Sequence, residues 1–184
     1  MFAELRSHLL LVGLSLGLCC GVYPAALLLF AQTVPSAAAG SLVAGPAGSP
    51  VGSRLLAQEF KSPKYLWPRP SGVGYNATGS GGSNLAASNP KLRERVAEQM
   101  KDATGPVPAD AVTASGSGLD PHLTLAAAKQ QVGRVAAARG RPEAEVTATL
   151  DALAFTPLAG LAGELLVNVL EVNLALDASG PVAH

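Results

Sequence analysis

Residues 7–30 read SHLLLVGLSLGLCCGVYPAALLLF, a run that contains no Asp, Glu, Lys or Arg. As a helix, Leu9 to Phe30 would rise about 1.5 Å per residue and extend about 33 Å, which matches a bilayer hydrocarbon core of about 30 Å. The run therefore predicts one transmembrane helix over residues 9–30, with most of the chain outside the bilayer.

A cleaved signal peptide is the alternative interpretation of this run. Residues 37–40 read AAAG and resemble a cleavage site. The apolar core of a signal peptide is about 7–15 residues long, however, and this run is longer. Its length favours a membrane anchor over a signal peptide.

The charges on either side of the span predict its orientation. Arg6 precedes the span, and the next Lys or Arg is Arg54. The positive-inside rule then places residues 1–8 in the cytoplasm and the following domain outside it, as in a single-pass membrane protein.

The span also carries a proline and a stripe of glycines. Pro24 predicts a kink, because proline lacks the N–H that a helix interior needs. Gly13, Gly17 and Gly21 recur every four residues and predict a face on which another helix packs closely. Glycine is also simply common in membrane helices, so this face is a hypothesis. The span holds no acid or base after His8 and is not a pore by itself.

Composition excludes several classes of protein. Both cysteines, Cys19 and Cys20, lie inside the span, so the remaining chain has neither a disulfide framework nor a cysteine-based metal site. Aromatic residues make up 4% of the chain, and the basic residues do not cluster with them, so we expect no nucleic-acid partner.

The net charge of zero hides an asymmetry between the two halves of the soluble part. Residues 54–101 hold eight Lys or Arg and three Asp or Glu, whereas residues 102–184 hold four and nine. We expect the two halves to fold together and to complement each other's charge. An acidic surface that concentrates cations is the alternative.

The pattern after the span predicts a flexible linker over residues 31–53, one soluble extracytoplasmic α+β domain over residues 54–177 and a tail over residues 178–184. Residues 51–60 look extended, and residues 61–89 are rich in Gly and Pro and should be irregular. The remaining elements follow from caps and periodicity. Helices are predicted from Asn89-Pro90, from Asp120-Pro121 to Gly140 and from Arg141-Pro142 to Thr156, and strands over residues 111–114 and 167–176.

No motif for ATP hydrolysis is present. The chain lacks a glycine-rich loop ending in Gly-Lys-Ser/Thr, and it lacks the Asp-Lys-Thr-Gly sequence of P-type pumps. Ser80-Gly81-Gly82-Ser83-Asn84 could form an anion-binding nest of backbone N–H groups, or a tight loop packed against the domain.

Ser117, Asp120 and His122 form the one constellation that suggests nucleophilic catalysis. A Ser-His-Asp triad needs a base that a carboxylate orients, and usually an exposed serine turn. The Gly-x-Ser-x-Gly elbow is missing. Asp120 is better explained as a helix N-cap, and Gln130, Gln131, Arg134 and Arg139 as a solvated helix face.

Several ordered motifs carry a resemblance to a known family. They are YLWPRPS at 65–71, SGGSNL at 80–85 with Asn89-Pro90, VTASGSGLDPH at 112–122, QVGRVAAARG at 131–140 and VNVLEVNLALD at 167–177. Together they resemble the C subunit of the bacterial potassium-transporting Kdp ATPase over nearly the whole chain. Two short sites depart from that family's usual pattern: Ala86-Ala87-Ser88 replaces Gly-Pro-Thr, and Leu165-Leu166 replaces Pro-Arg.

The resemblance implies a non-catalytic accessory subunit of a high-affinity, ATP-driven potassium uptake complex. Its implied partners are a channel-like potassium-translocating subunit, a P-type ATPase subunit and a small membrane peptide. The resemblance also implies a catalytic chaperone that raises the ATP affinity of the ATPase subunit. If ATP binds this chain, we expect it at Ser80, Gly81, Gly82, Ser83, Asn84, Gln131 and Arg134; no metal or other cofactor is expected. An independent membrane-anchored hydrolase that uses Ser117, Asp120 and His122 is the alternative.

Overall fold

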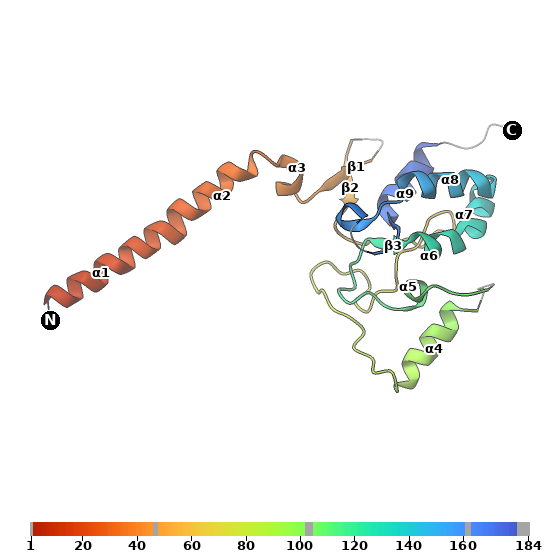
Figure 1. The fold of residues 1–184 in the computed structure, drawn as a ribbon, viewed down its shortest axis with the longest axis horizontal. Helices are drawn as coiled ribbons and strands as arrows, with labels where there is room; N and C mark the ends of the chain where they lie inside the picture. The colour runs from red at the N-terminus through yellow and green to blue at the C-terminus, as the bar shows by residue number, and fades with distance from the viewer. Residues whose placement is uncertain (1, 46–47, 102–104, 161–162, 180–184) are drawn as a thin grey trace. The chain divides into compact units, whose positions relative to one another are not determined.

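The computed structural model describes residues 2–45, 48–101, 105–160 and 163–179. The chain divides into two units, residues 1–41 and residues 42–184. Figure 1 shows both, each described here by itself. Residues 180–184 of the predicted tail lie outside the described residues.

The first unit is a long helix followed by one short turn of helix. It consists of α1 (Phe2–Leu16), the π-helical segment η1 (Gly17–Val22), α2 (Tyr23–Ala31) and α3 (Pro35–Ala38). The continuous helix Phe2–Ala31 is long and apolar enough to cross a membrane by its length and composition. It contains the whole predicted span 9–30 and extends beyond it at both ends.

The π-helical turn η1 lies directly before Pro24. Tyr23 N–H donates to the carbonyl of Leu18, five residues back. A proline clashes with the carbonyl four residues before it and offers that carbonyl no N–H. A wider π turn just before the proline is one way in which a helix accommodates that clash. The structure therefore records a local change of helix type where the sequence predicted a kink.

The second unit combines two small antiparallel sheets with several helices. Its elements are β1 (Leu42–Ala44), β2 (Pro50–Ser53), α4 (Pro90–Gln99), α5 (Ala109–Val112), β3 (His122–Thr124), α6 (Leu125–Gln130), α7 (Val132–Arg139), α8 (Glu143–Leu153), the 3₁₀ segment η2 (Pro157–Gly160), β4 (Leu166–Asn168) and α9 (Val169–Ala178). Strands β1 and β2 form a hairpin, and β3 pairs with β4 with His122 opposite Asn168. The mixture confirms an α+β chain.

The core lies between α6, α7, α8, α9 and the β3–β4 sheet. Its buried members are Leu66, Leu123, Ala127, Ala128, Val132, Val135, Ala136, Val146, Leu150, Val167, Val169, Val172 and Leu176. Leu66 is the one member of this cluster from the irregular segment before α4. That segment is therefore tied to the helices through its own buried side chain.

Several predicted elements are confirmed. Helix α4 begins at Pro90 with Asn89 as its cap, whose side chain accepts the Lys91 N–H at 3.0 Å. Gly140 ends α7 in the left-handed conformation, with φ of 63°. Helix α8 starts directly after Pro142. Residues 61–89 form neither helix nor strand, as their Gly and Pro content predicted, whereas only residues 51–53 of the predicted extended segment 51–60 lie in a strand.

The predicted strand over residues 167–176 is wrong beyond Asn168. Only Leu166–Asn168 form a strand, and Val169–Ala178 are helical. Asn168 begins the helix, because its side-chain oxygen accepts the Glu171 N–H at 3.2 Å. The fully buried Val169, Val172 and Leu176 lie three and four residues apart, which is the period of a helix rather than of a strand.

Two further predictions are wrong near the middle of the domain. Residues 109–112 form the short helix α5, so the strand predicted over 111–114 is absent. Asp120 does not cap a helix: residues 122–124 form β3, and α6 begins at Leu125 with Thr124 as its cap. The helix predicted from Asp120 to Gly140 is divided at Gln131 into α6 and α7.

The linker predicted over residues 31–53 contains regular structure. It includes α3 and the β1–β2 hairpin, and the second unit begins at Leu42 rather than at Arg54. Small, uncharged residues such as those of 42–53 can form a hairpin because strand pairing satisfies their backbone groups. Whether residues 32–41 are flexible stays a prediction.

Candidate functional site

The most polar contact region of the domain surrounds residues 62–67. Proline at positions 63, 68 and 70 removes backbone N–H groups from this stretch, so it cannot form a regular ladder with a strand. Buried backbone groups still need partners. In this domain, side chains from α7, α9 and Gln131 supply them.

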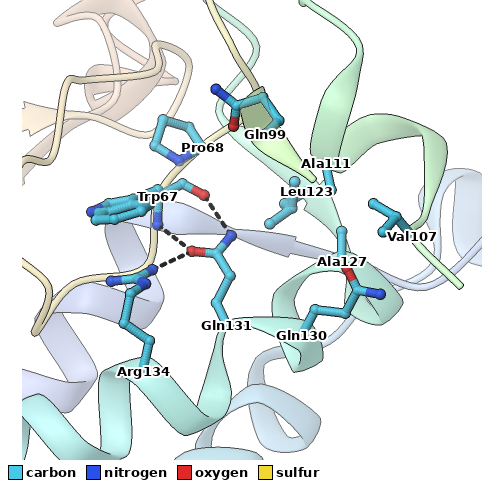
Figure 2. Close-up of a pocket in the computed structure, with 10 residues that line it drawn as sticks. All are labelled: Trp67, Pro68, Gln99, Val107, Ala111, Leu123, Ala127, Gln130, Gln131 and Arg134. Atoms are coloured by element: carbon cyan, nitrogen blue, oxygen red, sulfur yellow. Dashed lines mark hydrogen bonds between the residues drawn. The ribbon is translucent and has the colours of Figure 1, made fainter. Parts of the chain in front are cut away.

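Gln131 binds the backbone of Trp67 with both ends of its amide. Trp67 N–H donates to Gln131 Oε1 at 2.9 Å, and Gln131 Nε2 donates to the Trp67 carbonyl at 3.0 Å (Figure 2). A side-chain amide here imitates the pair of bonds that a neighbouring strand would make. Gln131 lies at the junction of α6 and α7, where the helix breaks.

Asn173 of α9 does the same for Leu66. Leu66 N–H donates to Asn173 Oδ1 at 2.7 Å, and Asn173 Nδ2 donates to the Leu66 carbonyl at 3.0 Å. Asn173 is 2% exposed. Two successive residues of the segment are therefore fixed by two amides that come from different helices.

Arg134 of α7 joins this arrangement from below the Trp67 ring. Its Nη1 donates to the carbonyls of Pro63 at 2.6 Å and Tyr65 at 3.0 Å, and its Nη2 donates to Gln131 Oε1 at 2.6 Å. The guanidinium lies 3.5 Å from the centroid of the Trp67 ring, a cation–π contact (Figure 2). Burial lowers the pKa of Arg134 to about 10, so it remains a cation at neutral pH.

Arg139 completes the set at the C-terminal end of α7. Its Nε donates to the Lys64 carbonyl at 2.6 Å, and its Nη2 pairs with Asp177 at 2.9 Å. The Tyr65 hydroxyl donates to the same Asp177 carboxylate at 3.1 Å. We call Gln131, Arg134, Arg139 and Asn173 the backbone clamp.

The backbone clamp corrects one prediction. Gln131, Arg134 and Arg139 are not a solvated helix face, since each binds a segment more than 60 residues away. Asn173 is a buried hydrogen-bonding group. The sequence feature that indicates the clamp is the set of prolines around Tyr65-Leu66-Trp67. Such prolines prevent regular strand pairing, so the backbone groups of this segment need side-chain partners.

A pocket of about 320 Å³ lies beside the clamp. Trp67 and Pro68 form one side, and the side chains of Leu123 and Ala127 lie across from them (Figure 2). The remaining lining residues are Gln99, Val107, Ala111, Gln130, Gln131 and Arg134. Gln131 and Arg134 line this pocket while their polar atoms bind the 63–67 segment.

The predicted Ser80–Asn84 nest packs against the Ser115–Gly118 loop. Gly81 N–H donates to the Ser117 carbonyl at 2.8 Å, and Ser80 Oγ donates to the same carbonyl at 3.0 Å. The Gly81 N–H is thus already engaged in a protein hydrogen bond. These contacts match the tight-loop interpretation of Ser80–Asn84.

The candidate nucleotide residues are divided between two pockets. Ser80 lines a second pocket of about 450 Å³, with Leu55, Leu56, Ser115, Gly116, Ser117, Leu119, Asp120 and Pro121. Gln131 and Arg134 line the first pocket instead. Asn84 has a left-handed φ of 51°, and a Cβ built on Gly82 would lie 3.1 Å from the Gly116 carbonyl oxygen. ATP binding at these residues stays a prediction.

The geometry does not support the hydrolase alternative. Ser117 Oγ lies 3.2 Å from Ser115 Oγ and accepts the Leu119 N–H at 3.2 Å. Asp120 pairs with Arg69 at 3.3 Å and lies 3.7 Å from His122 Nδ1. Within the described part of the chain, no hydrogen bond joins Ser117 to His122, and a triad needs that bond.

Two other features of the sequence can be placed. No Cβ built on Gly13, Gly17 or Gly21 would meet an atom within 4 Å, so this face of the helix is open, and its packing role stays a prediction. Among the described residues, no group of three or more His, Cys, Asp or Glu side chains is arranged to hold a metal ion.

Comparison with known proteins gives a consistent result over the whole chain. The family described as "K+-transporting ATPase, c chain" matches residues 5–178. A potassium-transporting ATPase KdpC subunit of Cereibacter sphaeroides is 49% identical over 173 residues, which cover 91% of this chain and 93% of that protein. Its counterpart in Geobacter sulfurreducens is 45% identical over an alignment of 187 residues, which covers 97% of this chain and 99% of that protein. The KdpC subunit of Parvibaculum lavamentivorans is 46% identical over 172 residues, which cover 91% of this chain and 92% of that protein.

The fold and the site together define a chain with one candidate membrane span and one α+β domain held together by a backbone clamp. The match spans both parts, from within α1 to the end of α9. The chain belongs to the family of KdpC subunits, the C chains of K+-transporting ATPases.

Proposed function

We propose that this chain is the non-catalytic, membrane-anchored accessory subunit of an ATP-driven potassium uptake complex, and that it stabilises the assembled complex. The backbone clamp supports this role most directly. Gln131 and Arg134, two of the residues considered for a nucleotide site, are engaged in fixing the chain's own 62–67 segment together with Arg139 and Asn173. These hydrogen bonds make the domain rigid, as is suitable for a subunit that acts by binding its partner subunits.

The anchor of this subunit is the helix Phe2–Ala31 in a bacterial inner membrane. Arg6 stands before the span, and no Lys or Arg follows it until Arg54. This distribution supports a cytoplasmic N-terminus and an extracytoplasmic domain. The open glycine face at Gly13, Gly17 and Gly21 is where a helix of the channel-like subunit packs.

The partners in this proposal are the channel-like potassium-translocating subunit, the P-type ATPase subunit and the small membrane peptide. The extracytoplasmic domain covers the outer mouth of the channel-like subunit. The chain also acts as a catalytic chaperone that raises the ATP affinity of the ATPase subunit. A domain outside the membrane cannot contact cytoplasmic ATP, so this effect reaches the ATPase subunit through the anchor and the assembled complex.

Direct binding of ATP to this chain is the alternative to that route and requires the domain to lie in the cytoplasm; Ser80 and Arg134 are the residues to test. Photo-crosslinking of an ATP analogue to the purified chain, followed by peptide mapping, locates any contact. Labelled peptides that contain residues 80–84 or 131–134 would support it. Labelling confined to the ATPase subunit in the complex would contradict it.

Deletion of this chain tests the accessory role. We expect membranes that contain the other subunits alone to lose potassium-stimulated ATPase activity, and re-expression of the chain to restore it. Partial activity with a raised apparent KM for ATP would favour the chaperone role over assembly alone. Activity and KM at the wild-type level without the chain would contradict the proposal.

A further inference from the structure

The turn after the β1–β2 hairpin holds its leucines outward in a fixed position. Leu55 is 62% exposed, yet its N–H donates to Ser53 Oγ at 3.1 Å. On either side of it, Asn168 Nδ2 donates to the Arg54 carbonyl at 2.9 Å, and Ala57 N–H donates to the Leu119 carbonyl at 2.8 Å. The backbone is thus tied to the domain both before and after the exposed side chains.

Four exposed apolar side chains surround Ser53. Leu42 lies opposite Ser53 in the hairpin, Val51 precedes Ser53 by two residues, and Leu55 and Leu56 follow it. Leu42 is 56% exposed, Val51 39% and Leu56 37%. We call Leu42, Val51, Leu55 and Leu56 the hairpin patch. Leu55 and Leu56 also border the second pocket, whose lining includes Leu119 and Pro121 together with serines and Asp120.

The position of the hairpin patch in the chain indicates what covers it. Residues 32–41 separate the end of the candidate span from Leu42. Ten residues extend at most about 36 Å, so Leu42 stays within that distance of the end of the span. The chain has no Asp, Glu, Lys or Arg from Ser7 to Ser53, so the hairpin lacks the charges that oppose entry into the interface.

The first charged residue after the span stands at the edge of the patch. Arg54 is held by Glu171 at 2.7 Å, and its side chain is 60% exposed. An arginine beside outward-facing leucines matches the arrangement of interfacial segments, in which apolar groups enter the acyl boundary and cations lie at the headgroups.

We propose that the hairpin patch binds the lipid bilayer surface and orients the extracytoplasmic domain on the membrane. This inference rests on the proposed anchoring of the chain by its N-terminal helix. The occupant is lipid, and the leucines of the fixed turn enter the boundary between headgroups and acyl chains.

Site-directed spin labelling of the full chain in lipid nanodiscs tests this. The bilayer is a mixture of phosphatidylethanolamine and phosphatidylglycerol, and each label is probed with oxygen and with a water-soluble nickel chelate. Leu55→Cys in a Cys19→Ala/Cys20→Ala background reports on the patch. Ala138→Cys in the same background is the control, since Ala138 is exposed on α7. Native Cys19 in a Cys20→Ala variant reports on the span.

We expect the Leu55 label to be severalfold less accessible to the nickel chelate than the Ala138 label and severalfold more accessible to oxygen. A Leu55 label as open to the chelate as Ala138, with the Cys19 label in lipid, would overturn the inference and leave the anchor intact. Protection of Leu55 that appears only when the partner subunits are added would also overturn it, in favour of a protein occupant. A Cys19 label exposed to the chelate would overturn the anchoring itself, and the inference with it.

Discussion

Asn173 is a small residue whose replacement should strongly destabilise the folded domain. It is 2% exposed and satisfies both backbone groups of Leu66, which is itself a buried member of the core. Replacement by leucine keeps the branching of the side chain but leaves a buried N–H and a buried carbonyl without partners. Each such group costs about 1–3 kcal/mol.

We therefore expect Asn173→Leu to lower the free energy of unfolding by about 2–6 kcal/mol. The measurement is urea unfolding of the full chain in detergent, followed by fluorescence of Trp67, the only tryptophan. Asn76→Leu is the matched control, because Asn76 is exposed and its side-chain oxygen accepts hydrogen bonds from the nearby Thr78. Equal effects of the two substitutions would contradict the clamp.

Tyr75 gives the domain a pH dependence. Its hydroxyl donates to the Arg69 carbonyl at 3.0 Å, and burial, aided by the charge of Glu59, raises its pKa above 10.0. The folded state then holds the phenol proton more tightly than the unfolded state does. The stabilisation is complete below pH 10.0 and is lost as the pH rises through the raised pKa.

Tyr75→Phe removes this group without changing the ring. We expect the wild-type chain to be more stable than Tyr75→Phe at about pH 8, and the difference to shrink as the pH rises to about 11. Denaturant unfolding of both proteins across that range measures it. A difference that stays constant would show that Tyr75 does not hold its proton more tightly in the folded state.

The two helices with asparagine caps differ in what their caps support. Asn168 caps α9, which contributes five buried residues, whereas Asn89 caps α4, which contributes none. The loss of a cap costs about 1–2 kcal/mol. Asn168 also bonds the Arg54 carbonyl.

We expect Asn168→Ala to lower the global free energy of unfolding by about 2 kcal/mol. The matched substitution Asn89→Ala should loosen α4 alone, because that helix can fray without opening the core. Hydrogen exchange of the amides of α4 and α9 distinguishes the two. Global destabilisation of the same size from Asn89→Ala would contradict this assignment.

Gly118 shows how closely the two serine–glycine loops pack. It has a φ of 70°, and a Cβ there would lie 2.5 Å from Val73 Cγ2 and 2.7 Å from the Gly81 carbonyl oxygen. Gly116 in the same loop has nothing within 4 Å of such a Cβ. We expect Gly118→Ala to destabilise the domain by about 2 kcal/mol or more, and Gly116→Ala by less than about 0.5 kcal/mol.

Thermal unfolding of the two variants measures this difference. Because both substitutions add one methyl group to one loop, their contrast isolates the strain at position 118. Similar melting temperatures for the two would mean that the loops can separate without cost. That outcome would reopen the nest interpretation of Ser80–Asn84.

For the helices and strands, capping residues at α4 and α7 predicted element ends correctly, whereas hydrophobic periodicity failed over residues 167–176. Asn89 and Gly140 marked a helix start and a helix end correctly from residue chemistry alone. The strand predicted over residues 167–176 was wrong because this segment is so apolar that it fits an alternating pattern as well as a helical one. The residues that fit the alternating pattern are Leu170, Val172, Leu174 and Leu176. The cap at Asn168 decides the case, and it was available in the sequence.

The backbone clamp could be predicted only in part. The prolines indicate that backbone groups of residues 62–70 need side-chain partners. The spacing of residues in the sequence does not predict that Gln131, Arg134 and Asn173 are these partners, because they lie 64 to 107 residues away. Such contacts follow from the packing of α7 and α9 against the segment. Sequence periodicity carries no information about contacts of that range.

For the whole molecule, the charge asymmetry between the two halves has a structural meaning. Arg54 pairs with Glu171 and Arg69 with Asp120, so basic residues of the first half meet acidic residues of the second. Other ion pairs of the described residues, such as Lys129–Asp151 and Arg139–Asp177, lie within one half, so these two pairs support the predicted charge complement only in part. The span, by contrast, offers no charge to a partner, so the anchor must associate by shape.

The central claim is that this chain works as part of a potassium-transporting ATPase complex. The most direct test is affinity purification of the tagged chain from membranes of potassium-starved cells in mild detergent, with quantitative mass spectrometry of what is recovered. The account predicts a channel-like subunit and a P-type ATPase subunit in stoichiometric amounts. Recovery of the chain alone, from cells shown to express the pump, would contradict it.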